Sequence, residues 1–108
     1  MKTIEWAAGL FEGEGTITKN RSNSYYLQLS MVDKDVVEMF LETLGVGKFY
    51  ELKAVTITGK TIYRASIHKI KDVRAVLTKF LPHLGNRRAH KALDCLDILD
   101  YKDNKFLN

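Results

Sequence analysis

Two carboxylates close a run of small residues near the start of the chain. Residues 7–15 read AAGLFEGEG, with Gly9 and Gly13 one helical turn apart and Glu12 and Glu14 at the end. A helix that ends at this point would hold both acids at the negative end of its macrodipole, which costs roughly a few tenths of a kcal/mol or more. A bound cation would reverse this penalty, so the pattern indicates a metal site at a helix end.

The small residues of the run suit close packing of two helices. Gly9 and Gly13, with Ala8 beside them, leave room for the backbone of a second copy of the same helix. The competing interpretation is that small residues only let the helix pack on its own sheet. Pairing of two copies would bring both Glu14 carboxylates to one twofold axis, where each copy supplies half of a metal site. Such hard oxygen ligands suit Mg²⁺ and hydrolysis of a phosphodiester.

Length and composition limit the class of protein. The chain has 108 residues, 45% of them apolar, which is enough for one domain over residues 1–108 with helices on a sheet. Its 17 Lys and Arg against 13 Asp and Glu give a net charge of +4, which favours a polyanionic partner. The one cysteine, Cys95, lies in an apolar helical pattern and predicts a buried, unreactive thiol in a reducing compartment.

No apolar run is long enough to span a membrane, and the first residues lack a secretory signal. We therefore expect an intracellular protein, in the cytoplasm or an organelle matrix, with no membrane as a partner. Gly59-Lys60-Thr61 indicates a hairpin turn rather than a phosphate loop, because a strand follows it, so no nucleotide cofactor is expected. The three histidines lack the spacing of zinc ligands.

The order of elements follows from hydrophobic periodicity and turn residues. It predicts an α+β fold of order αββαββα, with one extra helical turn or break, in which helices cover one face of a four-stranded antiparallel sheet. Phe49, Ile62, Ala65 and Ile67 are expected on the buried side of the second hairpin. The expected elements are a helix over Ile4 to Gly13, strands over Thr16 to Asn20 and Tyr25 to Val32, a helix capped by Asp33 and stopped by Gly45, strands over Lys48 to Ile57 and Thr61 to His68 around a turn at Thr58-Gly59-Lys60, a helix around Val73 to Phe80, and a last helix capped by Asn86.

The other face of this sheet is expected to be polar. Polar strand faces are often simply solvated. Here two hairpins both carry donors, aromatic rings and amides with almost no acids, which favours the reading of base edges in a DNA major groove. The expected residues of this face are Thr18, Asn20, Tyr26, Gln28, Ser30, Lys48, Tyr50, Arg64, Ser66 and His68.

The segment from Trp6 to Ile17 resembles the signature motif of the LAGLIDADG homing endonucleases. Both acids of the motif are Glu here in place of Asp. Gly9 keeps the glycine of the family name, and Gly13 stands where the name has alanine. The positions that differ from the family name are Ala7, Phe11, Glu12, Gly13 and Glu14. The similarity extends over nearly the whole chain through the αββαββα order, the segment from Leu27 to Lys34, Gly45-Val46-Gly47 and Phe80-Leu81-Pro82.

The resemblance implies a single-motif, homodimeric, Mg²⁺-dependent endonuclease that binds double-stranded DNA and makes a staggered break in a long, nearly palindromic site. In the family the second acid of the motif binds metal with help from the carbonyl of the preceding residue. These positions are Glu14 and Gly13 here, and Glu12 is expected to cap or support the helix contact. The implied dimer interface is Ala8, Gly9, Glu12 and Gly13.

Two peripheral positions are also assigned by the resemblance. A polar residue at the end of the second strand maps to Asp33, for which a role in organising water and the role of an ordinary helix cap are equally open. A basic residue near the start of the last helix maps to Arg87, which can stabilise phosphate charge but cannot act as a base. Arg87, Arg88 and Lys48 are expected to contact phosphates, although a basic cluster on a helix is often only a solvated face.

Two other classes of function fit the same residues. A non-catalytic nucleic-acid binder on this fold, either an RNA maturase or a transcription regulator, would keep the charge and the sheet. A sheet face that binds a protein or a small ligand would make the charge incidental, and would give no steep salt dependence of nucleic-acid affinity.

Overall fold

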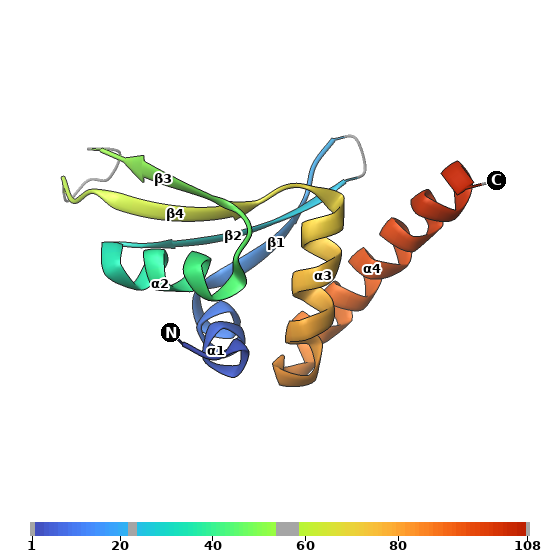
Figure 1. The fold of residues 1–108 in the computed structure, drawn as a ribbon, viewed down its shortest axis with the longest axis horizontal. Helices are drawn as coiled ribbons and strands as arrows, with labels where there is room; N and C mark the ends of the chain where they lie inside the picture. Colours follow the sequence, from blue (N-terminus) through green and yellow to red (C-terminus); the bar gives the residue numbers. More distant parts are fainter. Residues whose placement is uncertain (1, 22–23, 54–58, 108) are drawn as a thin grey trace.

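The computed structural model of the chain contains one antiparallel sheet with helices on one side of it (Figure 1). It describes residues 2–21, 24–53 and 59–107, with side chains described up to residue 99. The elements are α1 (Ile4–Glu14), β1 (Gly15–Lys19), β2 (Tyr25–Met31), α2 (Lys34–Leu44), β3 (Lys48–Leu52), β4 (Ile62–Ile67), α3 (Ile70–Phe80), the 3-10 turn η1 (Leu81–His83) and α4 (Asn86–Leu107). The predicted α+β architecture is confirmed, and the order αββαββα is followed by the turn η1 and the helix α4.

The expected boundaries differ from the observed ones by a few residues at most where the structure describes them. Gly45, with φ of 70°, ends α2 in the left-handed conformation expected of a glycine cap. The end of the predicted strand at residues 54–57, and Thr58 of the predicted turn, lie outside the described residues. Asn86 is the first residue of α4 rather than its cap, because the Gly85 carbonyl accepts the first helical hydrogen bond from Ala89 N–H at 2.8 Å. No helix among the described residues has the length and apolar character needed to cross a membrane.

The sheet has the strand order β1-β2-β4-β3, so the two hairpins join through β2 and β4. Its register places Thr16, Gln28, Ser66 and Lys48 in one row across all four strands. Because side chains alternate between the faces of a sheet, this row and its neighbours two residues away share one face. Ile17, Leu27, Leu29, Ala65 and Ile67 point the other way and are buried under the helices.

Three phenylalanines from three helices meet at the centre of the core. Phe80 of α3 lies 5.5 Å from Phe11 of α1 and 6.2 Å from Phe40 of α2, measured between ring centroids. All three rings are at most 1% exposed. Cys95 of α4 is buried, and burial raises the pKa of its thiol to about 12, as expected for an unreactive cysteine. The core therefore ties α1, the helix with the two acids, firmly to the rest of the chain.

Two of the four expected core residues of the second hairpin are placed differently. Ala65 and Ile67 are buried as predicted. Ile62 has the same strand parity as Arg64, so it belongs to the open face of the sheet and is only half-buried. Phe49 does point toward the helices, but it is 37% exposed because β3 is an edge strand that α2 covers only in part. Its ring stacks on Tyr63 at 5.8 Å instead.

The turn from α1 into β1 requires a residue without a side chain. Gly15 is buried, and a Cβ built there would lie 2.2 Å from Cδ1 of Phe11. The Phe11 ring therefore covers the Gly15 backbone directly, at the point where the helix ends and the strand begins.

We expect Gly15→Ala to lower the free energy of unfolding by roughly 1–3 kcal/mol, the usual cost of overpacking a core. Urea unfolding measures this. Adding Phe11→Leu removes the ring that clashes, so the double variant should lose less than the sum of the two single losses. An unchanged free energy of unfolding in Gly15→Ala would contradict this packing.

Candidate nucleic-acid interface and metal centre

The two acids at the end of α1 have different surroundings. The carboxylate of Glu14 is exposed and makes no hydrogen bond or ion pair with any residue that the structure describes. Glu12 is half-buried, and its Oε1 accepts a hydrogen bond from the Gly85 N–H at 3.1 Å. Its Oε2 lies 3.2 Å from Nε of Arg88. The structure thus turns one acid toward the start of α4 and leaves the other free.

Arg88 reaches from α4 to the end of α1. Its Nε donates to the Glu12 carbonyl at 2.7 Å, and its terminal NH1 donates to the Gly15 carbonyl at 2.5 Å. Since the Nε hydrogen points at that carbonyl, the approach of Nε to the Glu12 carboxylate is an ion pair without a hydrogen bond. The side chain of Arg88 is only 20% exposed. This is an intramolecular role that sequence reasoning missed, and a role for Arg88 as a phosphate ligand stays a prediction.

The preceding residue, Arg87, is exposed. Together with Arg88 and Lys91 of α4 and with Thr16 and Ile17 of β1 it lines a pocket of about 260 Å³ at the edge of the sheet. Three cationic side chains around one hollow favour an anion there. Arg87 lies near the start of the last helix as expected, and its role toward phosphate stays a prediction.

The outward face of α1 is open at both glycines. Gly9 and Gly13 are exposed, and a Cβ built on either would meet no atom within 4 Å. The space that these glycines provide is thus not used inside the chain. Ala8, also expected at a dimer interface, needs correction, because it is fully buried against its own core and faces away from this surface.

The end of α1 offers oxygen ligands for a divalent cation. Among the side chains that the structure describes, which end at residue 99, no group of three or more His, Cys, Asp or Glu gathers at one place. One chain supplies the free Glu14 carboxylate and, one residue earlier, the Gly13 carbonyl. Mg²⁺ in proteins is often bound by one or two carboxylates plus phosphate oxygens of a substrate, so these donors fit it.

Asp33 lies between β2 and α2, at the N-cap position of α2. Its carbonyl accepts hydrogen bonds from Val36 and Val37 N–H, whereas its carboxylate makes no capping bond. The side chain of Asp35 bonds the Val36 N–H instead, at 3.0 Å. Asp33 is thus the N-cap residue as expected, but it caps α2 through its backbone carbonyl and not through its side chain, and a role in organising water stays a prediction.

The open face of the sheet carries three side-chain pairs, two between β2 and β4 and one between β2 and His68, the residue after β4. Tyr26 and His68 stack with ring centroids 4.9 Å apart. Gln28 Nε2 donates to Ser66 Oγ at 3.3 Å, and Arg64 Nε donates to Ser30 Oγ at 2.9 Å. Gln28 and Ser66, and Ser30 and Arg64, are register partners two residues apart, and His68 directly follows β4, so the three pairs form a ladder along the middle of the face.

The remaining expected face residues lie around this ladder. Thr18 of β1 pairs with Tyr26, and Lys48 and Tyr50 of β3 pair with Ser66 and Arg64. Tyr50 is 42% exposed. The sequence thus brings these side chains to one face as predicted from strand alternation.

Two expected base-reading residues are placed differently. Asn20 follows β1 in the hairpin turn, where its N–H donates to the Ser24 carbonyl and its Oδ1 accepts from the Ser24 N–H. Ser66 belongs to the open face by register but is only 2% exposed, and its Oγ accepts a hydrogen bond from Gln28. The strand pattern predicts an exposed strand residue at both positions. Asn20 instead lies in the turn, and neighbouring side chains cover Ser66.

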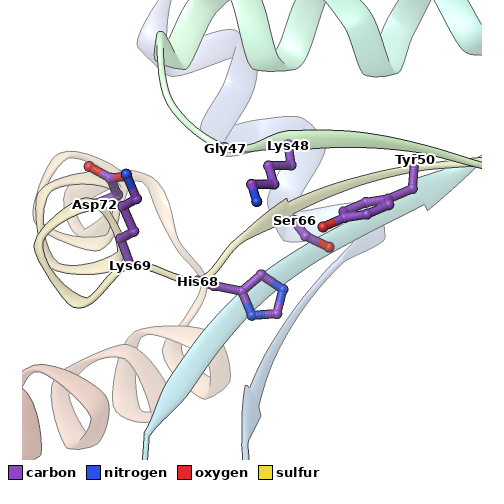
Figure 2. Close-up of a pocket in the computed structure, with 7 residues that line it drawn as sticks. All are labelled: Gly47, Lys48, Tyr50, Ser66, His68, Lys69 and Asp72. Atoms are coloured by element: carbon purple, nitrogen blue, oxygen red, sulfur yellow. The ribbon is translucent and has the colours of Figure 1, made fainter.

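A pocket of about 360 Å³ lies at the end of the open face, between β3, β4 and the start of α3 (Figure 2). The sequence did not predict a hollow there, although four of its lining residues were expected on the face. Gly47, with φ of 102°, allows β3 to start close to β4, because a Cβ there would lie 3.0 Å from the Ser66 carbonyl. The lining residues are Gly47, Lys48, Tyr50, Ser66, His68, Lys69 and Asp72.

The fold is similar to that of solved endonucleases. The homing endonuclease I-CvuI in complex with its target superposes with a TM-score of 0.71 over 90% of this chain at 18% identity, and this chain spans 65% of its length. The archaeal intron-encoded homing endonuclease I-Vdi141I, complexed with DNA, gives a TM-score of 0.69 over 94% of this chain and 69% of its own, also at 18% identity.

A third solved structure carries the motif in its name. The LAGLIDADG homing endonuclease I-GzeII in complex with its DNA target has a TM-score of 0.75 and 18% identity, over 97% of this chain and 38% of its own. No protein-family model matches this sequence, and neither does any curated protein. At 18% identity these similarities establish the fold of the chain. The fold agrees with the motif in residues 7–15. The chain has the fold of the LAGLIDADG homing endonucleases.

Proposed function

We propose that this chain is one half of a homodimeric, Mg²⁺-dependent, site-specific DNA endonuclease. The observation that carries the proposal is the difference between the two acids at the end of α1. Glu12 is held by Gly85 and Arg88, whereas Glu14 is exposed beside the open glycine face of the same helix. A free carboxylate next to a face suited to a second helix is what a metal site shared between two chains needs.

The proposed dimer pairs two copies of α1 through Gly9 and Gly13. The absence of any described atom within 4 Å of a Cβ at either position leaves room for a partner backbone. A twofold axis along this contact brings the two Glu14 carboxylates together, and each chain contributes its Gly13 carbonyl. Glu12 supports the contact from within its own chain.

The proposed DNA surface is the open face of the sheet, continued across the twofold axis by the second copy. Gln28 and Arg64, each bonded at one end to a serine, present their remaining donors and acceptors for base edges in a major groove. Lys48 and Arg87 are exposed cations at the border of this face and are assigned to phosphates. The other proposed contacts are Thr18, Asn20, Tyr26, Ser30, Tyr50 and His68, whereas the buried Ser66 acts through Gln28 and Arg88 is engaged with the end of α1.

The proposed chemistry is hydrolysis of one phosphodiester per strand. Mg²⁺ held by Glu14 and Gly13 supplies Lewis acidity, which favours ionisation of water and stabilises a leaving oxygen. Asp33 organises water at the edge of the site, and Arg87 stabilises phosphate charge without exchanging a proton. Two such centres across a twofold axis imply a staggered double-strand break in a long, nearly palindromic sequence.

Selection from a random DNA library tests this function. The full chain is incubated with the library in Mg²⁺ or in EDTA, and cut and bound DNA are sequenced separately. We expect a nearly palindromic target that is cut on both strands only with Mg²⁺. Selective binding without cutting would instead support the non-catalytic nucleic-acid binder, and affinity without steep salt dependence would exclude a DNA surface of this kind.

Ser66 is expected to act on specificity through Gln28. Ser66→Ala removes the hydroxyl that holds the Gln28 amide, so the preference at the base pair read by Gln28 should fall by about 0.5–1.5 kcal/mol, the net value of one hydrogen bond. Competition binding with single-base variants of the selected target measures this.

Lys48→Ala is the matched control for this experiment, because Lys48 is the register partner of Ser66 on β3. It should weaken binding evenly across the target variants and reduce the slope of the salt dependence by about one. Loss at several base pairs in Ser66→Ala, or none, would contradict the proposed role.

A further inference from the structure

The backbone around Gly13 and Glu14 is held from outside the helix. The last carbonyls of a helix normally lack partners within the helix. Here the Glu12 and Gly15 carbonyls, on either side of this pair, both accept hydrogen bonds from Arg88. The Gly15 N–H donates to the Phe11 carbonyl in addition. The two proposed metal donors therefore lie in a segment that is fixed at both ends by one side chain.

The carboxylate of Glu12 completes this arrangement. It accepts the Gly85 N–H and pairs with Arg88, so it joins the end of α1 to the residue just before α4. A Cβ on Gly85 would lie 2.5 Å from Glu12 Oε1, so a side chain there would displace the Glu12 carboxylate from this contact. An acid at the negative end of a helix is unfavourable by itself, and the cation of Arg88 offsets that cost.

We propose that Arg88 and Glu12 form a positioning clamp that sets the geometry of the Gly13 carbonyl and the Glu14 carboxylate for the metal. The inference rests on the proposed function, since it concerns the metal donors of that site. Neither residue touches metal or DNA in this role. Both act through the backbone of residues 12–15.

Arginine suits the clamp better than lysine. Its planar guanidinium presents several donors in a fixed fork, so Nε and NH1 reach two carbonyls at once. Lysine keeps the charge but has one compact ammonium. Arg88→Lys therefore tests the geometry of the clamp while it preserves the charge beside Glu12.

Arg87 provides a matched control within the same turn of α4. It is the same residue type at the adjacent position, is exposed, and makes no hydrogen bond to α1 among the described residues. Arg87→Lys changes the phosphate-facing side of the site and leaves the clamp in place.

The first measurement is binding of Mn²⁺ as a paramagnetic probe, in the absence of DNA. Broadening of the Glu14 and Gly15 amide resonances is followed in the full chain for wild type, Arg88→Lys, Glu12→Gln and Arg87→Lys. We expect Arg88→Lys and Glu12→Gln to need about tenfold more Mn²⁺ than wild type for half-maximal broadening, as for other residues that orient metal ligands. Arg87→Lys should match wild type.

The second measurement is the Mg²⁺ concentration for half-maximal cleavage of the selected target. The same two clamp variants should raise it about tenfold, with DNA affinity in Ca²⁺ close to that of wild type. Arg87→Lys should instead weaken DNA affinity without a change in the Mg²⁺ requirement. Glu12→Gln keeps the oxygen that accepts the Gly85 N–H, so it remains informative if Arg88→Lys does not fold.

Two results separate failure of the clamp from failure of the function. Equal Mn²⁺ midpoints in wild type and both clamp variants would overturn the clamp, whether or not the protein cuts DNA. A wild type that binds Mn²⁺ at Glu14, loses this binding in the clamp variants and does not cut any DNA would support the clamp and overturn the endonuclease.

Discussion

Replacement of Glu14 by Gln is expected to abolish cleavage of both DNA strands and to leave DNA binding intact. Gln has the same shape, but it removes the free charge at the end of α1 that the proposed metal needs. The rate should fall by roughly a thousandfold, comparable to the loss of one electrostatic catalytic group. Cleavage of target labelled on both strands measures the rate, and gel shift in Ca²⁺ measures the affinity.

Glu5→Gln is the matched control for this experiment. Glu5 is an exposed acid in the first turn of the same helix, at the far end from Glu14. The control should cut at the wild-type rate. Cleavage by Glu14→Gln at the rate of Glu5→Gln would remove Glu14 from the chemistry and favour a metal site elsewhere.

Replacement of Gly9 by Leu is expected to stabilise the monomer and destroy the dimer. A leucine fits the single chain because nothing lies within 4 Å of the added Cβ, and glycine is about 0.8–1 kcal/mol worse than alanine in a helix interior. In the proposed dimer the same side chain meets the partner backbone. Overpacking costs roughly 1–3 kcal/mol at one site. The twofold axis creates two such sites in the dimer, so the dimer is destabilised by both.

Sedimentation and urea unfolding separate these two effects. Gly9→Leu should sediment as a monomer at concentrations where wild type is a dimer, should not cut DNA, and should resist urea at least as well as an isolated wild-type chain. Ala75→Leu, at an exposed position of α3, should remain dimeric and active. A Gly9→Leu variant that stays dimeric would place the interface away from α1.

Much of the fold follows from local sequence signals. Strand alternation puts Gln28 and Arg64 on the open face and Leu27 and Leu29 in the core, and the structure agrees. Gly45 ends its helix as a glycine cap should. Signals of this kind depend on a few neighbouring residues, and for that reason one sequence is enough to carry them.

The misplaced core residues depend on position within the sheet. Phe49 has the pattern of a buried strand residue, but it lies on an edge strand that α2 only partly covers. Ile62 is apolar and lies on the open face, where its parity rather than its hydrophobicity decides its direction. The local sequence pattern determines neither the order of the strands in the sheet nor which strands the helices cover.

In the candidate site, too, local features could be predicted from the sequence and long-range contacts could not. The sequence places Glu12 and Glu14 together at a helix end, and it suggests a supporting role for Glu12. It does not reveal that Arg88 points back to α1, because a basic run on a helix has the pattern of a solvated face and the contact joins residues 76 positions apart. Ser66 likewise takes its burial and its bond to Gln28 from a partner strand 38 residues away.

The mass of the complex between the full chain and its selected DNA tests the central claim most directly. Sedimentation equilibrium in Ca²⁺, at low micromolar protein, counts the chains on one duplex. Two chains per duplex is the expected result, because each chain holds only one free motif carboxylate. One chain per duplex, in a protein that still cuts both strands in Mg²⁺, would contradict a metal centre shared between two copies of α1.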